Sequence, residues 1–336
     1  MERQKSMKAE SKFHVIDVDR LGFIFLLCLL LGILPLIIRS PYYRDWMVMS
    51  FLWAGAAGAW NIIGGFAGQL SIGHASFFGI GAYTSVLLYV NHGISPWFGM
   101  VVGGMLSALT AAIIGISTLR LRGTFFVLAT IAFAEVLRLM ATAWRSLTRG
   151  SLGISPDFQP AFMNMMWRGK IAYIYLAFAY MIFILVICVL IERNKLGYYL
   201  TALREDEDAA QSLGVPAARA KTVAFIMSAF LTSLAGSIYA QYVLYIEPDV
   251  VFGIMVSVQV LLFGIVGGRG SALGPIIGAL IVVPLGSFLR GQLAAVSGLH
   301  GFVYGLALVL VVIFAPEGVY GYLLLRSRRR RQMRRS

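Results

Sequence analysis

The chain has 336 residues, of which 59% are hydrophobic and 13% are charged, and its formal net charge is +13. A water-soluble domain cannot bury this much apolar surface, so the composition excludes an ordinary soluble protein and predicts a chain whose solvent is largely lipid. Because the basic residues flank apolar segments and do not line a polar face, the positive charge also argues against nucleic acid as a partner.

Ten apolar stretches are long enough to cross a membrane as helices, which takes about 20 residues. They cover residues 21–38, 46–66, 70–90, 97–118, 124–143, 171–191, 222–243, 251–266, 273–289 and 299–314. Lipid accommodates only helices or closed barrels, and the period-two alternation of a barrel strand is absent. The sequence therefore predicts an all-α integral membrane protein, a polytopic bundle of about ten transmembrane helices that fills residues 21–315.

The distribution of Lys and Arg predicts the orientation of these helices. With the N-terminus in the cytoplasm, the segments on the cytoplasmic side hold 20 of the 28 basic residues. Basic residues concentrate on that side of membrane proteins, so we expect both termini, residues 1–20 and 316–336, to be cytoplasmic. The C-terminal tail carries seven arginines and is expected to anchor the topology against the headgroups of membrane lipid.

Two segments combine apolar character with an unusual density of glycine. They are GGFAGQLSIGHASFFGIGAY, residues 64–83, and LLFGIVGGRGSALGPIIGAL, residues 261–280. In each block, small residues recur at steps of three or four, which on one helix face lets another helix approach closely. The predicted helix-packing seams are Gly68, Gly79, Gly267, Gly274 and Gly278. The alternative is that these glycines loosen or break helices beside a pathway through the membrane.

Polar side chains at membrane depth are candidates for a substrate path, because such groups face the bundle interior or a water-filled cavity. The candidates are Gln69, Ser71, His74 and Glu135. Interior packing is the alternative for Gln69 and for His74, which we expect to be neutral and hydrogen-bonded. For Glu135 the alternative is a salt bridge with Arg138, three residues along the same helix face. The lone histidine predicts no metal site, and the sequence contains no catalytic constellation.

The cytoplasmic loop of residues 192–221 contains LGYYLTALREDEDAAQSLGVPAARAK, which has the pattern of a short amphipathic helix. Apolar residues from Leu200 to Leu213 recur near helical spacing, with an acidic run on the other side. Gly214, followed two residues later by proline, is typical of a helix end. The helix is too acidic to prefer anionic lipid, so we expect it to dock into a groove on a partner protein. A solvated connector is the alternative.

Three parts of the sequence resemble one family. The segment DAAQSLG, residues 208–214, resembles the E-A-A-x-x-x-G coupling motif of permeases in ATP-binding cassette (ABC) importers, with Asp208 in place of the usual Glu. The longer string ALREDEDAAQSLGV is similar to the version in branched-chain amino-acid permeases. Both Gly-rich blocks and the ending FAPEGVYG, residues 314–321, resemble signatures of the same family, the first block particularly its M-type subunit.

The resemblance implies a permease subunit of an ABC importer for branched-chain or related amino acids in a cell inner membrane, with no enzyme activity or cofactor of its own. The implied partners are a second homologous permease, two cytoplasmic ABC ATPases and an extracytoplasmic substrate-binding protein. The implied ATPase-coupling helix contains Leu203, Arg204, Glu205, Asp206, Glu207, Asp208, Ala209, Ala210 and Gly214. The sequence has no G-x-x-x-x-G-K-[ST] phosphate loop, so ATP hydrolysis is expected on separate chains. The alternatives are a permease for urea or short amides, a secondary transporter and a channel.

Overall fold

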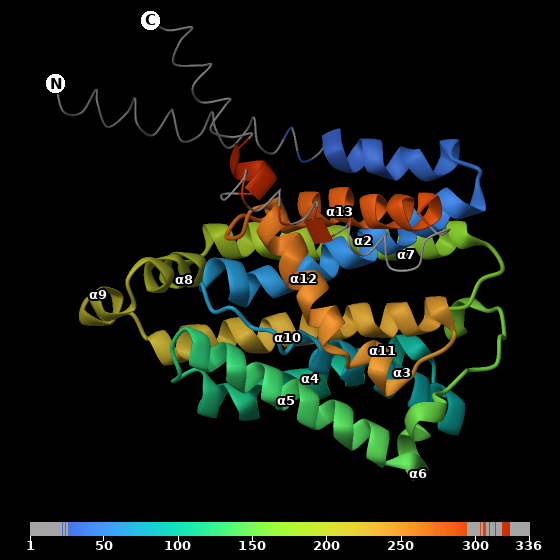
Figure 1. Ribbon diagram of the computed structural model, residues 1–336, viewed down its shortest axis with the longest axis horizontal. Coiled ribbons are helices and arrows are strands. Elements are labelled where there is room, and N and C mark those ends of the chain that lie inside the picture. Colours follow the sequence, from blue (N-terminus) through green and yellow to red (C-terminus); the bar gives the residue numbers. More distant parts are fainter. Residues whose placement is uncertain are drawn as a thin grey trace, which may run out of the picture.

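The computed structural model describes residues 22, 24, 26–293, 303, 305, 306, 309, 313 and 318–322. In this part of the chain, long helices run roughly side by side, with the short helices α8 and α9 at one end and α6 at the other (Figure 1). The described residues contain only two isolated β-bridges and no longer strand. The predicted all-α polytopic fold is confirmed. The expected cytoplasmic segment 1–20, most of the span 299–314 and most of the basic tail lie outside the described residues.

The helices follow one another with short connections. After an apolar helix over Leu26–Ile37, the elements are α2 (Pro41–Asn61), the π-helix η1 (Ile62–Phe66), α3 (His74–His92), α4 (Pro96–Thr118), α5 (Thr124–Ala143), α6 (Arg145–Thr148), the 3-10 helices η2 (Gly150–Leu152) and η3 (Phe162–Asn164), α7 (Lys170–Arg193), α8 (Lys195–Glu205), α9 (Glu207–Ser212), α10 (Ala217–Val243), α11 (Pro248–Val251), α12 (Ile254–Gly267) and α13 (Gly274–Gln292).

Seven helical segments of the described residues are long and apolar enough to cross a membrane. They are Pro41–Phe66, α4, α5, α7, α10, Pro248–Gly267 and α13. The prediction of about ten spans was imprecise. α3 occupies the place of the third predicted span but begins at His74 and not at residue 70, and the first predicted span is described as the shorter helix Leu26–Ile37.

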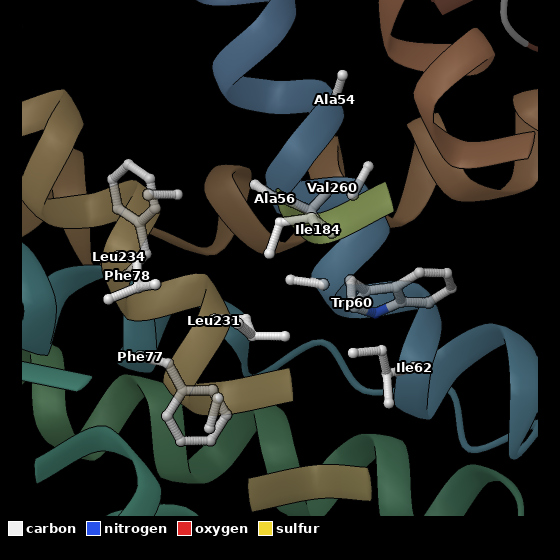
Figure 2. Close-up of a cluster of buried hydrophobic side chains, with 14 of the residues drawn as sticks. Ala54, Ala56, Trp60, Ile62, Phe77, Phe78, Ile184, Leu231, Leu234 and Val260 are labelled. Carbon is white, nitrogen blue, oxygen red and sulfur yellow. The ribbon is translucent and has the colours of Figure 1, made fainter. Parts of the chain in front are cut away.

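The core is built around α2 and α10. In their apolar stretches 89% and 72% of the residues are buried, against 17% in α5. Trp60 of α2 is fully buried, and its indole N–H donates a hydrogen bond to the backbone carbonyl of Ser71 over 2.9 Å. Figure 2 shows Trp60 and Ile62 among side chains that come from α3, α7, α10 and α12. Helices α3, α4, α7, α12 and α13 pack on this centre, whereas α5 packs mainly against α3 and α11.

Helices α3 and α10 meet backbone to backbone. A Cβ atom added to Gly81 of α3 would overlap the carbonyl oxygen of Ser233 on α10, and one added to Gly236 of α10 would overlap that of Phe78. Gly79, one of the predicted seam residues, lies against the ring of Phe252. Glycine is needed at these positions because no side chain fits between the helices.

The first Gly-rich block is interrupted and is not one continuous helix. α2 passes into η1, whose i→i+5 bonds make a wider turn, and residues 67–73 are irregular. Gly68 has a φ of +68°, which favours glycine. The backbone N–H of Ile72 donates to Thr130 Oγ1 on α5 over 3.2 Å. The expectation that Gly68, Ser71 and Gly79 share one helix face is therefore wrong, because the chain leaves the helix before Gly68.

The second Gly-rich block is interrupted in the same way, between the end of α12 at Gly267 and the start of α13 at Gly274. Gly268 and Gly270 in this turn have φ values of +112° and +79°. The spacing predicts that Gly267, Gly274 and Gly278 share one helix face. This is wrong for Gly267, which ends α12, whereas the other two lie in α13. The turn folds α13 back on α12, so a Cβ atom on Gly267 would overlap the Gly274 carbonyl oxygen. Both blocks thus form a helix end, a tight Gly-rich turn and a new helix start.

Candidate coupling and substrate-path sites

The predicted coupling helix consists of two short helices at one end of the bundle (Figure 1). Asp206 separates α8 from α9 with an extended backbone, φ −154°. Its side chain caps α9, because the carboxylate accepts a hydrogen bond from the Ala209 backbone N–H over 3.0 Å. The prediction of one helix from Leu200 to Gly214 is therefore wrong, since Asp206 starts a second helix within it.

α9 ends at Ser212 with Leu213 as its C-cap, and Gly214 follows with a φ of +85°, so the helix stops where the sequence predicts. The N–H of Gly214 donates to the Gln211 carbonyl over 2.9 Å, and the N–H of Val215 donates to the Ala210 carbonyl over 3.0 Å. This pair of bonds forms the Schellman motif, which satisfies the carbonyl groups at a helix end. The α8–α9 segment therefore has a defined break and a defined end.

The acidic residues of α9 face basic residues of the same chain. Asp208 accepts two hydrogen bonds from the Arg122 guanidinium, at 2.7 and 3.1 Å. Glu207 Oε2 lies 3.7 Å from Arg122 Nε and 2.7 Å from Nζ of Lys221 on α10. The hydrogen bonds from Arg122 hold the pKa of the Asp208 carboxyl below its ordinary value. These contacts hold α9 against α10 and the connection between α4 and α5.

Lys221 is the buried member of this group. Its side chain is 1% exposed, against 19% for Glu207, so the ammonium group forms its ion pair almost out of contact with solvent. Removing one partner of a buried pair leaves an uncompensated charge, at a cost of about 3–5 kcal/mol. The Glu207–Lys221 pair therefore ties α9 firmly to α10.

The apolar residues of the segment do not form an open docking stripe. Leu200, Leu203 and Ala210 are buried within the chain, whereas Leu213 is 87% exposed. The expectation of a continuous apolar face for a partner is wrong, because three of its four residues pack against the bundle. Of these four residues, Leu213 remains open to a partner, just after α9 and before Gly214.

Two of the four substrate-path candidates, Ser71 and His74, lie together in the core. His74 Nδ1 is 3.2 Å from Ser71 Oγ, and Nε2 is 2.8 Å from Ser228 Oγ on α10. The Ser228 hydroxyl donates its proton to the Ala59 carbonyl over 2.7 Å, so Nε2 donates to Ser228 and Nδ1 of a neutral ring accepts from Ser71. The predicted hydrogen bonding of His74 is confirmed. A role of either residue in a substrate path stays a prediction.

Gln69 and Glu135, the other two candidates, lie apart from this core group. Gln69 is half-buried in the irregular segment before α3. Glu135 on α5 forms the expected ion pair with Arg138, at 2.5 Å, and Arg138 also pairs with Asp249 of α11. The Glu135 side chain is 48% exposed on the surface of the chain. Within the described residues, hydrogen bonds therefore join Ser71 to His74, whereas Gln69 and Glu135 lie elsewhere.

Sequence reasoning missed three polar residues that hold this end of the bundle together: Asn61, Arg122 and Lys221. Asn61 is fully buried at the end of α2, and its side-chain amide bonds both Gly270 and Ser271. A single amide residue inside an apolar span was the signal that could have revealed it. Among the described residues, no group of three or more His, Cys, Asp or Glu could hold a metal ion.

Comparison with known proteins decides the family. Residues 42–312 match the family described as "Branched-chain amino acid transport system / permease component". The chain belongs to this permease family. The matched range contains the α8–α9 segment and both Gly-rich blocks, so the family resemblance seen in the sequence is confirmed.

Named relatives of this permease include two from Escherichia coli (strain K12). It is 28% identical over 283 residues to the "High-affinity branched-chain amino acid transport system permease protein LivM", an alignment that covers 77% of this chain and 65% of LivM. It is 25% identical over 282 residues to the corresponding LivH protein, covering 78% of this chain and 89% of LivH. The permease thus spans about two thirds of the length of LivM.

One solved structure also aligns with the permease. It is titled "PsaBC from Streptococcus pneumoniae in complex with Fab", and the alignment covers 86% of this chain and 96% of that chain at 14% identity with a TM-score of 0.46. A similarity this low defines neither fold nor function.

Proposed function

We propose that this permease forms part of the membrane path of an ATP-driven importer for branched-chain or related amino acids. The observation that carries the proposal is the ordered α8–α9 segment, which contains the coupling motif and stands at one end of the bundle. A second permease, two ATPases and an extracytoplasmic substrate-binding protein complete the assembly. The proposal places the permease in a cell inner membrane with α8 and α9 in the cytoplasm.

In this proposal, the tip of α9 is the contact with an ATPase. The acidic residues Glu207 and Asp208 already have basic partners within the chain, whereas Leu213 is 87% exposed. An exposed leucine at the end of a fixed helix suits an apolar groove on a partner. Movement of the ATPase pair would press on this tip, and the Glu207–Lys221 pair would pass the movement to α10.

α5 is the proposed face toward the second permease. Only 17% of its apolar stretch is buried, and Phe125, Leu128 and Glu135 lie exposed on one side of the helix. A charged side chain in a membrane helix faces protein or water in preference to lipid. A zwitterionic amino acid carries one charge of each sign, which suits the Glu135–Arg138 pair beside such a path.

The helix stop at Gly214 provides the direct test. Gly214→Leu places a side chain at a φ of +85°, where a non-glycine residue costs about 1–2 kcal/mol and the end of α9 must rearrange. We expect ATP-driven uptake by the reconstituted transporter to fall at least about tenfold, while membrane insertion is unchanged. Uptake of a labelled amino acid into proteoliposomes measures the effect.

Gly93→Leu is the matched control, because Gly93 also has a positive φ, +65°, and an added Cβ atom meets nothing within 4 Å at either glycine. It ends α3 and lies outside the coupling segment. Wild-type uptake by Gly214→Leu would show that the coupling assignment is wrong. Downhill movement of solute by the purified permease alone would favour a channel or secondary transporter, and uptake of urea or acetamide but not leucine would replace the substrate class.

A further inference from the structure

Arg204, near the end of α8, reaches from the coupling segment into both Gly-rich turns. Its Nη1 donates a hydrogen bond to the Gly65 carbonyl oxygen over 3.2 Å. A Cβ atom on Gly270 would overlap Nη1, and one on Gly68 would lie 2.7 Å from Arg204 Cγ. The stem of the arginine therefore lies against the first turn and its guanidinium lies between the two turns, at positions where only glycine leaves room.

Asn61 fixes the second turn to the end of α2. Its Oδ1 accepts a hydrogen bond from the Gly270 backbone N–H over 2.9 Å, and its Nδ2 donates to the Ser271 carbonyl over 3.0 Å. Because Asn61 is the last residue of α2 and is fully buried, the turn after α12 is fixed to the end of α2. Asn61 and Arg204 therefore both contact the turn after α12 and the end of the span Pro41–Phe66.

The contact with Gly65 occupies a backbone group that the helix itself leaves free. Gly65 lies in η1, near the end of the span Pro41–Phe66, and the last carbonyl groups of a helix have no partner within it. A guanidinium suits this position, because it is a strong donor and because positive charge is favourable at a helix C-terminus. Arg204 thus caps a span whose apolar stretch is 89% buried.

The other edge of the guanidinium is held by the neighbouring acidic residue. Glu205 Oε1 accepts hydrogen bonds from Arg204 Nη2 at 2.9 Å and from Nε at 3.2 Å. The Glu205 side chain is 71% exposed, whereas that of Arg204 is 30% exposed. A protein bound to α8–α9 would have access to the Glu205 carboxylate. A contact with that carboxylate would compete with its hydrogen bonds from Arg204.

We infer that Arg204 is the positioning residue that links displacement of the α8–α9 segment to the two Gly-rich turns. This inference rests on the proposed function. The Glu207–Lys221 pair acts on α10, which is continuous from Ala217 to Val243. Arg204 acts instead where the spans are interrupted and the backbone has the freedom of glycine, so it determines whether movement outside the membrane changes the shape of the bundle.

The test uses the assembled transporter with Arg204→Met, which keeps the apolar stem and removes the donors to Gly65 and Glu205. A hydrogen bond from a charged donor is worth about tenfold or more in an equilibrium. We expect the amount of amino acid taken up per ATP hydrolysed to fall by about tenfold, while assembly and ATP hydrolysis persist. Arg204→Lys, which retains charge and one donor toward Gly65, should restore part of this ratio.

Arg219→Met is the matched control, because Arg219 is an exposed arginine near the start of α10 at the same end of the bundle. An uptake-to-ATP ratio in Arg204→Met equal to that of this control would overturn the inference. If Arg204→Met does not assemble, Arg204→Lys provides the test, because lysine cannot form both of the arginine's hydrogen bonds to Glu205 in the same geometry. An uptake-to-ATP ratio below that of the wild type would then support the inference, and a wild-type ratio would overturn it. Failure of the wild-type assembly to couple uptake to ATP would instead contradict the proposed function.

Discussion

Helices α10 and α5 are both apolar enough to cross a membrane, yet α10 is largely enclosed by other helices of the chain whereas α5 is largely exposed. In α10, 72% of the apolar stretch is buried, against 17% in α5. Ser228 and Ser237 of α10 donate hydrogen bonds to carbonyl groups of α2 and α3, and Gly236 allows direct backbone contact. α5 presents apolar side chains and an exposed Glu135 on its open side.

The difference shows that hydropathy identifies a candidate span but does not tell whether that span packs inside its own chain or at its surface. Apolar character alone identifies both helices as candidate spans. Small residues and hydroxyls are typical of a helix that packs within its own chain, because they allow close approach and find carbonyl acceptors there. A charged residue on an otherwise apolar open face is typical of a helix that meets another protein or water. The two patterns separate a structural span from a candidate interface.

The largest effect on stability is expected from a side chain placed between α10 and α3. In Gly236→Leu, the new side chain would overlap the Phe78 carbonyl and force the helices apart, which should cost about 3 kcal/mol or more. Thermal unfolding of the purified protein in detergent measures the loss. Gly169→Leu is the control, since a Cβ atom there meets nothing within 4 Å and its φ is −107°. Equal melting temperatures for the two variants would contradict the close contact.

An intermediate effect is expected from His74→Ala, which removes both hydrogen bonds of a fully buried ring. The Ser71 and Ser228 hydroxyls lose a partner, so the protein should be less stable by about 1–3 kcal/mol. Gln69→Ala, at a half-buried position, should cost less than about 1 kcal/mol. Denaturant unfolding compares the two. If His74→Ala retains wild-type stability but alters uptake kinetics, the histidine belongs to the path and not to the packing.

The smallest effect on stability is expected on α5. Glu135→Gln removes the negative charge beside Arg138 but leaves Asp249 in place, so the free energy of unfolding should change less than in His74→Ala. If α5 lines the path, the concentration for half-maximal uptake should rise by about tenfold, the size expected for a lost charged hydrogen bond. Asp157→Asn, an exposed acid outside α5, is the control. Unchanged uptake kinetics would return Glu135 to a purely structural ion pair.

Parts of the fold could be predicted because apolar length and boundary residues agree. The span 124–143 coincides with α5, which lies between Gly123 and Trp144. The start of α3 could not be predicted in the same way, because residues 70–72, Leu-Ser-Ile, join the apolar stretch without a proline or a charge to mark a break. The helix is interrupted before α3 by the positive φ of Gly68 and by the hydrogen bond from the Ile72 backbone N–H to Thr130. Neither feature produces a periodic pattern in the sequence.

The candidate coupling segment shows the same division. Its end at Gly214 was predictable, since a positive φ before a proline has a distinct residue pattern. Its internal break was not, because Asp206 lies in a run of acids in which Asp208 is an equally good N-cap by residue type. The partners of those acids, Arg122 and Lys221, come from other elements, so only the folded chain reveals them.

The wide π-helical turn Ile62–Phe66 sets the rotation, about the helix axis, of the residues that follow α2. Its backbone hydrogen bonds join residues five apart, whereas those of an α-helix join residues four apart. The turn therefore contains one extra residue compared with a turn of α-helix. Each residue of an α-helix turns the chain by about 100°. Tightening this turn into an ordinary α-helix would rotate the Gly65 carbonyl about the helix axis. Because the guanidinium of Arg204 donates to the Gly65 carbonyl of this wide turn, any change in the turn would have to move or break that hydrogen bond.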